Sequence, residues 1–263
     1  MTTAVGRPPK PRTAWKTWAA IAAVAAITIL AGWAIDFSLV PTIRNVDYWL
    51  RTMAAFMTPN WEYFPRIVQP LWVTFSISFV SATITTAIAI VLAMLASKVT
   101  TRVTWVYRLV KGVLAVTRSL PDVVWAMLFV AIVGQGPFAG TLAMIAFGVG
   151  IVAKLTAETI DAVDRGPLES VDAAGGSAFQ RARVAVVPAI LPNFASYALY
   201  NFESTVRASV VLGYVAAGGV GQALSNQSKD GNYNNVATIV LATLVLVIAI
   251  DTISWLLRRW LSR

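Results

Sequence analysis

Residues 236–257 read VATIVLATLVLVIAIDTISWLL, and this apolar run decides the fold class. About 20 apolar residues are enough for a helix to cross the hydrocarbon core of a bilayer. In hydrocarbon every backbone polar group must pair internally, which leaves only helices or a closed barrel. Because the apolar residues follow one another without alternation, the run predicts a transmembrane helix.

Five more runs of this kind precede it, at residues 18–35, 71–96, 113–133, 138–157 and 189–215. The chain of 263 residues is 57% hydrophobic and 13% charged, with a mean hydropathy of +0.69. A soluble domain is about half apolar and about a quarter charged. We therefore expect an all-α integral membrane protein with six transmembrane helices.

These runs divide the chain into three parts: a basic leader (1–16), a first transmembrane helix with an outer loop (17–70), and a main transmembrane domain (71–263) that contains a polar loop (158–188). The first run resembles a signal peptide in its basic flank and small residues. It is long enough to span, however, and no clear cleavage site follows. We interpret it as an uncleaved helix.

Basic residues outnumber acidic ones by 21 to 12 and gather in the short polar segments. In a six-span bundle the leader, the 98–111 segment, the 158–188 loop and the C-terminal arginines share one side. The positive-inside rule makes that side the cytoplasm, with both termini cytoplasmic in a bacterial inner membrane. The excess charge is thus a topology signal, and we expect lipid rather than nucleic acid as a partner.

Cysteine and histidine are both absent. Their absence excludes disulfides and thiolate metal sites, and it removes the commonest general base. We therefore expect no metal site and no catalytic residue in the chain. A membrane-bound enzyme working through carboxylates is an alternative, with Asp122 and Glu203 as its pair.

The polar loop contains the stretch ESVDAAGGSAF at residues 169–179. Pro167 suits the first turn of a helix, where its missing N–H costs nothing, and Glu169 would then lie in that turn, favoured by the helix dipole. Gly175 is a natural helix stop. The pattern predicts a short helix from Pro167 to Gly175, outside the bilayer, that fits a groove on a partner. An ordinary amphipathic connector is the alternative.

Arg118, Asp122, Glu203 and Arg207 are charged residues that lie within apolar runs. Each costs about 2.5–3.5 kcal/mol at the bilayer centre, so they should face the bundle interior or a wet cavity. Glu203 and Arg207 are spaced i, i+4, and we expect them to form an ion pair with each other. Alternatively, Arg207 or Arg118 presents positive potential to an anion that crosses the membrane.

Pro121 breaks the third run, and the backbone groups freed there must be satisfied by protein or water. This makes the segment containing Arg118, Ser119, Pro121 and Asp122 a candidate constriction of a pathway; a tolerated kink is the alternative. Gly218, Gly219 and Gly221 allow tight turns on the outer side. We expect a re-entrant loop there that touches a substrate or its binding protein, rather than a plain helix-ending turn.

The loop that holds Glu169, Gly175 and the Val187-Pro188 pair resembles the "EAA" loop of ABC-transporter importer permeases, although Ser170-Val171 replace its two alanines. The run from Arg207 to Gln222 resembles the "G-x-x-G-A-G-G-x-G" end of a span in methionine- and phosphonate-type permeases. Arg118-Ser119-Leu120-Pro121-Asp122 is similar to an "R-S-x-P-E-x-V-W-A" run of the phosphonate type. Tyr200-Asn201-Phe202-Glu203, leading to Arg207, also resembles that subfamily. By these motifs together, the chain resembles a type I importer permease, closest to the phosphonate-transport (PhnE) family.

The resemblance implies a five-helix core of the methionine-permease kind plus one peripheral N-terminal helix. It implies alternating-access import of a phosphonate, phosphite or phosphate, with methionine or another small solute as the nearest alternative and an ion channel as a further one. The residues it places against an ATPase are Pro167, Glu169, Asp172, Ala173, Ala174 and Gly175. No Gly-x-x-x-x-Gly-Lys-Ser/Thr loop is present, so ATP and Mg belong to a separate ATPase dimer. The remaining partners that it implies are an extracytoplasmic binding protein and a second, identical permease copy.

Overall fold

The computed structural model describes residues 14–38, 40–101, 103–215 and 217–261, and within these ranges it holds helices and no strand. Internal contacts divide the chain into two units, one ending at Met53 and the other beginning at Ala54. The first unit holds α1 (Ala14–Ala34), α2 (Val40–Arg44) and the start of α3 (Val46–Met57). The expected leader, residues 1–16, lies almost wholly outside the described residues.

The second unit continues from the end of α3 with a 3₁₀ turn and then with long helices interrupted by short ones. Its elements in chain order are the 3₁₀ turn Trp61–Tyr63, α4 (Phe64–Leu95), α5 (Thr104–Ser119), α6 (Asp122–Val133), α7 (Pro137–Asp161), α8 (Arg165–Ala173), α9 (Ala178–Arg181), a π-helical turn (Ala182–Val186), α10 (Val187–Gly213), α11 (Gly219–Lys229) and α12 (Tyr233–Leu261).

Among the described residues, five helical segments are long and apolar enough to cross a membrane: Trp15–Ala34, Trp61–Leu95, Pro137–Asp161, Ala178–Gly213 and Tyr233–Trp260. A sixth candidate is the pair α5 and α6, which passes the same criterion together but is bent by 94°. The expected all-α membrane class is confirmed. A span count of six holds only if the bent pair is one span.

Two boundaries differ from the expected ones. The outer loop expected up to residue 70 is largely helical, and α4 begins at Phe64, because Pro65 occupies the first turn where a missing N–H is harmless. The fifth span begins at Ala178, since α9 and the π-helical turn continue into α10. Pro188 therefore lies inside a continuous helical segment.

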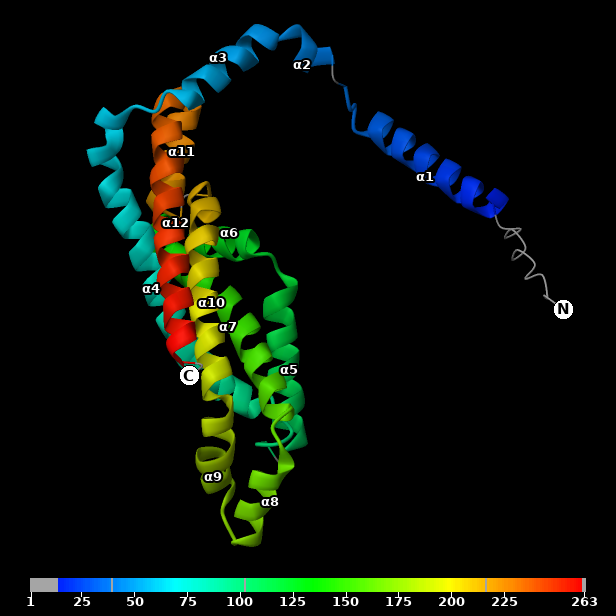
Figure 1. Cartoon of the computed structure of the whole chain (residues 1–263), viewed down its shortest axis with the longest axis vertical. Coiled ribbons are helices and arrows are strands. Elements are labelled where there is room, and N and C mark those ends of the chain that lie inside the picture. The colour runs from blue at the N-terminus through cyan, green and yellow to red at the C-terminus, as the bar shows by residue number, and fades with distance from the viewer. Residues whose placement is uncertain (1–13, 39, 102, 216, 262–263) are drawn as a thin grey trace, which may run out of the picture. The chain divides into compact units, whose positions relative to one another are not determined.

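The long helices of the second unit pack around α7. It contacts α4, α5, α6 and α10, while α10 also contacts α4, α11 and α12. In Figure 1, α8 and α9 lie at one end of this bundle and α11 lies at the other end. These two ends are called the α8 end and the α11 end below.

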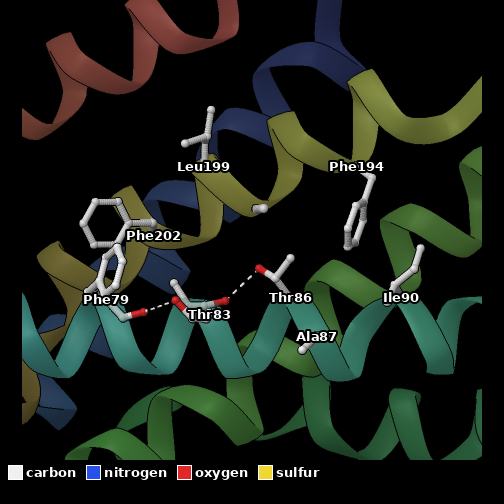
Figure 2. Close-up of a pocket in the computed structure, with 10 residues that line it drawn as sticks. Phe79, Thr83, Thr86, Ala87, Ile90, Phe194, Leu199 and Phe202 are labelled. Carbon is white, nitrogen blue, oxygen red and sulfur yellow. Dashed lines mark hydrogen bonds between the residues drawn. The ribbon is translucent and has the colours of Figure 1, made fainter. Parts of the chain in front are cut away.

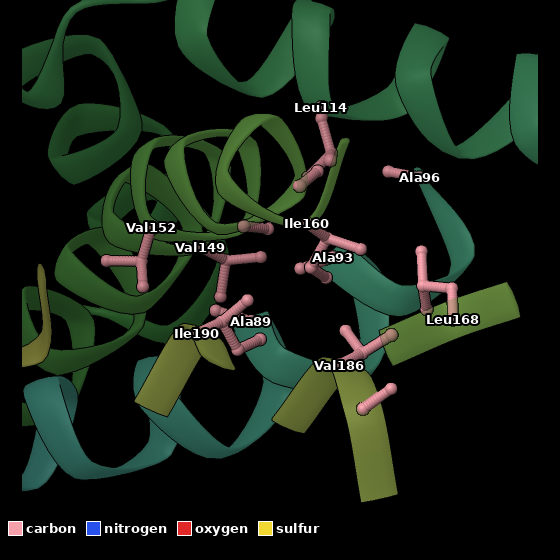
Figure 3. Close-up of a cluster of buried hydrophobic side chains, with 13 residues drawn as sticks. Ala89, Ala93, Ala96, Leu114, Val149, Val152, Ile160, Leu168, Val186 and Ile190 are labelled. Atoms are coloured by element: carbon pink, nitrogen blue, oxygen red, sulfur yellow. The ribbon is translucent and has the colours of Figure 1, made fainter. Parts of the chain in front are cut away.

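A buried cluster joins α4, α7 and α10 to the α8 end (Figure 3). Six of its thirteen members are alanines, and Ala89 and Ala93 of α4 share the cluster with Val152 and Ala153 of α7, all fully buried. Small residues let helix backbones approach closely in a membrane, where van der Waals packing drives association. The same cluster takes in Leu168, so α8 is packed onto the ends of the long helices.

Candidate functional site

The short helix α8 is defined by caps at both ends. Asp164 precedes it, and the Asp164 carboxylate accepts a hydrogen bond from the Gly166 backbone N–H at 3.3 Å. At the other end Gly175 adopts φ +73°, and the N–H groups of Gly175 and Gly176 donate to the carbonyls of Asp172 and Val171. This is a Schellman ending, in which a residue in the left-handed region satisfies the last carbonyls. The predicted stop at Gly175 is confirmed.

The start of α8 differs from the prediction. The helix begins at Arg165, two residues before Pro167, because Asp164 supplies the N-cap. Its first turn holds no acidic residue, so the expected position of Glu169 in that turn is wrong. Pro167 is the third helical residue, still where its missing N–H is tolerated.

One face of α8 is buried and the other is exposed. Leu168 is 7% exposed and belongs to the buried cluster, a burial that contributes about 1.5–3 kcal/mol. Glu169, Asp172 and the Ala173–Gly175 stretch are exposed. Phe179, just beyond, is 74% exposed, an apolar group of the kind that anchors protein interfaces.

Arg181 holds α8 in place. Its guanidinium donates through Nη1 to Asp172 Oδ2 at 3.1 Å and through Nη2 to the Val99 carbonyl at 2.8 Å. The first contact reaches the end of α8 and the second reaches the segment that follows α4. The Arg181 side chain is 15% exposed, so these contacts join α8 to the segment after α4 in mostly buried surroundings.

The predicted break at Pro121 is confirmed as the 94° bend between α5 and α6. Side chains satisfy the backbone carbonyls that the bend frees. Trp125 Nε1 donates to the Thr117 carbonyl at 3.1 Å, and Ser119 Oγ donates to the Val116 carbonyl at 2.8 Å. Asp122 begins α6, where a negative charge is favoured by the helix dipole. The bend is therefore stabilised by the side chains on both sides of it.

The expected ion pair between Glu203 and Arg207 is wrong. Arg207 Nη1 lies 3.0 Å from Asp251 Oδ2, and Glu203 is paired with Arg258, so both residues of α10 turn to α12. The partners on α12 lie 44 and 55 positions away along the chain. Sequence reasoning missed Asp251 and Arg258. The signal for Asp251 was a carboxylate inside the apolar run 236–257.

The two ion pairs differ in their surroundings. Glu203 is 6% exposed, so its pair with Arg258 is part of the helix packing. The side chains of Arg207 and Asp251 are 47% and 42% exposed, although both helices are long and apolar enough to span. Charged groups within a membrane span face protein or water rather than lipid.

At the α11 end the glycine-rich segment is a short helix, α11, that packs on α4, α10 and α12. Gly218 and Gly219 lead into it with φ +90° and +71°, and the Thr74 hydroxyl of α4 accepts from the Val220 N–H at 2.8 Å. Gly221 lies so close to the Val210 carbonyl that an added Cβ would overlap it. The chain thus folds back against its own bundle after α10.

A cavity of about 340 Å³ opens beside this helix. Its polar lining comes from α4 and α11: Arg66, Gln69, Gln222 and Asn226, together with the backbone at Gly218 and Gly219. Amide and guanidinium groups offer hydrogen bonds to a polar solute. The cavity thus lies beside the glycines predicted to face a substrate.

A larger cavity, of about 440 Å³, lies between α4 and α10 (Figure 2). Aromatic and aliphatic side chains line it, among them Phe79, Phe194 and Phe202. The hydroxyls of Thr83 and Thr86 donate to carbonyls of their own helix at 2.8 and 2.7 Å. This cavity therefore presents no charged group to an ion.

In the part of the chain that the structure describes, neither a metal site nor the suggested catalytic pair of carboxylates is brought together. There, no group of three or more His, Cys, Asp or Glu residues could hold a metal ion. Asp122 bonds to the Val123 N–H at 2.8 Å, and Glu203 pairs with Arg258. The two carboxylates suggested as an enzymatic pair thus have separate partners.

Known proteins match this chain in sequence. The family described as "Binding-protein-dependent transport system inner membrane component" matches residues 89–263. The phosphite transport system permease protein PtxC of Stutzerimonas stutzeri is 33% identical over 246 residues, which are 93% of this chain and 90% of that one. The phosphate-import permease protein PhnE of Mycolicibacterium smegmatis is 31% identical over 232 residues, or 88% of this chain and 44% of that one.

Solved structures match it in fold. A structure of the MetNI methionine ABC transporter in an inward-facing conformation aligns with a TM-score of 0.69 at 21% identity, covering 78% of this chain and 100% of that one. A bacterial alginate ABC transporter, in complex with an alginate-bound periplasmic protein, aligns with a TM-score of 0.61 at 14% identity, covering 86% and 94%. The chain therefore belongs to the family of binding-protein-dependent transport system inner membrane components, and it is a multi-pass inner-membrane permease of an ABC importer.

Proposed function

We propose that this permease imports a phosphorus oxyanion (a phosphonate, phosphite or phosphate) by alternating access. The observation that carries the proposal is the 33% identity with a phosphite transport permease over 93% of the chain. Arg118 in the spanning region, which has no carboxylate within ion-pair distance in the described part of the chain, agrees with an anionic cargo, because guanidinium groups match the geometry of phosphorus oxyanions. Arg207 is a second guanidinium there, and it is paired with Asp251. The pathway would pass the bend at Ser119, Pro121 and Asp122 and the α10 residues Glu203 and Arg207.

We propose that α8 is the coupling helix, docked in a groove of a separate ATPase. Support comes from the exposed Glu169, the exposed Phe179 near it, and the Arg181 contacts that link α8 to the segment after α4. ATP and Mg would be bound by that ATPase, a dimer. The α8 end, both termini and the basic segments would then be cytoplasmic, with the α5–α6 pair as the third of six spans.

At the opposite end, Gly218, Gly219 and Gly221 would face an extracytoplasmic binding protein. The polar cavity of about 340 Å³ beside α11 supports this assignment, because a released solute needs a recess at the entrance of the pathway. The cargo would pass from the binding protein into this recess when the bundle opens outward.

The permease would work as a pair of identical copies. An ATPase dimer needs two coupling helices, and the described chain offers one, α8. The half-exposed Arg207–Asp251 pair supports a second copy or an aqueous pathway against this face of α10 and α12. Lipid tails alone would leave the pair poorly solvated.

The test is ATPase stimulation in the complete transporter. The permease is co-purified with its ATPase, reconstituted, and assayed with the binding protein loaded with phosphate, phosphite, methylphosphonate or methionine. We expect stimulation by at least one phosphorus oxyanion and none by methionine. Stimulation by methionine alone would place the chain with methionine importers. ATPase activity that is the same with and without the permease would contradict the assignment as a permease of an ABC importer.

A further inference from the structure

A second charged region lies between α5 and α7, away from the α10–α12 ion pairs. We infer that the cavity lined by Lys111, Arg118 and Lys154 binds a phosphorus oxyanion near the α8 end. The inference rests on the proposed function for the identity of the cargo. The cationic cavity itself follows from the geometry of this chain.

The cavity measures about 280 Å³, which is room for a small hydrated oxyanion. Arg118 follows Lys111 by seven positions, about two helical turns, so both line the cavity from one face of α5. Lys154 and Glu158 line it from α7. The floor is apolar, formed by Ala96, Leu114, Ala115 and Ala157.

Three cations and one carboxylate surround this space. Lys154 Nζ lies 3.4 Å from Glu158 Oε1, which compensates one positive charge. Lys111 Nζ donates to the Tyr107 hydroxyl at 2.7 Å, and Arg118 Nε donates to the Leu114 carbonyl at 3.1 Å. Neither contact supplies a negative charge. Among the described residues, no carboxylate lies within ion-pair distance of Lys111 or Arg118.

Glu158 and Asp161 act on Lys111 only from beyond ion-pair distance. Two cations beside one cavity, without a direct carboxylate partner in the ranges described, favour an anion there. Positive charge in a spanning helix is costly unless it is paired or hydrated. An oxyanion with two negative charges would balance both Lys111 and Arg118. The Arg118 guanidinium can give a phosphorus oxyanion two parallel hydrogen bonds, and lysines act as point charges around it.

Gly150 of α7 makes room for Arg118. A Cβ at position 150 would lie 2.5 Å from Thr117 Oγ1 and 2.8 Å from Arg118 Cγ. The missing side chain therefore lets the stem of Arg118 lie against α7 at the edge of the cavity. Gly112, on α5 itself, has nothing within 4 Å of such a Cβ and serves as a matched control.

The position of the cavity relates it to α8. Lys154 and Glu158 belong to the last turns of α7, which ends at Asp161 shortly before α8 begins at Arg165. The Asp161 carboxylate accepts from Ser97 Oγ at 2.6 Å and fixes this end of α7 to the end of α4. An anion between α5 and α7 would therefore bridge two helices close to the proposed ATPase contact.

The test measures binding of inorganic phosphate to the complete transporter in phosphatidylcholine nanodiscs, without the binding protein. We expect Arg118→Gln to weaken binding about tenfold or more, and Lys111→Gln or Lys154→Gln about threefold or more. Gly150→Ala should weaken binding as Arg118→Gln does, while Gly112→Ala should leave it unchanged. The thermal unfolding transition of each variant shows that it has folded.

A phospholipid headgroup carries the same phosphorus oxyanion chemistry, so a second arm uses nanodiscs that contain phosphatidylglycerol. If phosphate does not bind but retention of phosphatidylglycerol falls in the Lys111, Arg118 and Lys154 variants, the oxyanion is a headgroup. If neither ligand responds to these substitutions in folded protein, the inference is overturned. Phosphate binding that depends on Lys111, Arg118 and Lys154, without any ATPase stimulation by a phosphorus oxyanion, would overturn the proposed function. The anion site itself would still be supported.

Discussion

Arg207 of α10 and Asp251 of α12 form an ion pair, with Nη1 and Oδ2 3.0 Å apart and both side chains nearly half exposed. About one turn along α10, the buried Glu203 pairs with Arg258 of the same partner helix. Two cross-helix pairs of opposite orientation thus fix the register of α10 against α12. The two pairs differ in exposure. Glu203 is buried in its pair with Arg258, whereas the Arg207–Asp251 pair lies at the surface of the unit.

Exchanging the charges of the exposed pair tests its register. Arg207→Asp alone should bring two carboxylates together and lower thermal stability, with Asp251→Arg harmful in the same way. The double exchange should recover much of the loss, with a coupling on the order of 1 kcal/mol between positions in direct contact. Thermal unfolding of the purified chain in detergent measures it. Additive losses in the double variant would mean that the two residues do not interact.

Glu203→Gln removes one partner of the buried pair and leaves the Arg258 guanidinium without its carboxylate. Breaking a buried ion pair in this way costs about 3–5 kcal/mol, and the partial exposure of Arg258 places the effect near the lower end. Unfolding in detergent should show it, with Arg258→Gln giving a similar loss. As a comparison, Glu62→Gln, an exposed change in the 3₁₀ turn, should have little effect.

Glu169→Ala should uncouple the transporter without unfolding it, because Glu169 is exposed on the free face of α8. We expect ATPase stimulation by loaded binding protein to fall at least tenfold while thermal stability stays within about 0.5 kcal/mol, as for other surface substitutions. Asp230→Ala, an exposed acidic position at the α11 end, is the control for basal ATPase activity. Unchanged stimulation in the Glu169 variant would remove α8 from the coupling mechanism.

Gly175→Ala should destabilise the end of α8, because φ at this position is +73° and an added Cβ is strained there. The expected cost is about 1 kcal/mol. Hydrogen exchange of the backbone amides in residues 165–176 should speed up accordingly, with the long helices unaffected. Gly166→Ala, at a position in the first turn with room for a Cβ, should not have this effect.

Local signals in the sequence predicted local structure well. Pro121 marked the bend between α5 and α6, and Gly175 marked the end of α8, since both act through their own backbone. The start of α8 was missed because the Asp164 cap competes with Pro167 as a start signal. Each of these features depends on a few neighbouring residues.

Contacts between distant segments could not be predicted in the same way. The i, i+4 spacing of Glu203 and Arg207 suggested a pair, but helix packing brings Asp251 and Arg258 closer to them. The cavity beside Lys111 and Lys154 likewise exists only because α5 packs on α7. Spacing along one helix gives no information about a second helix, so these sites appear only in the folded chain.

ATP-dependent uptake into proteoliposomes tests the assignment of this permease most directly. The permease, its ATPase and its binding protein are reconstituted, and accumulation of labelled phosphate, phosphite, methylphosphonate and methionine is compared with and without internal ATP. We predict accumulation of at least one phosphorus oxyanion that requires ATP and is abolished by Glu169→Ala. Accumulation of methionine alone, or uptake that proceeds equally without ATP, would contradict the assignment as an ATP-driven importer of a phosphorus oxyanion.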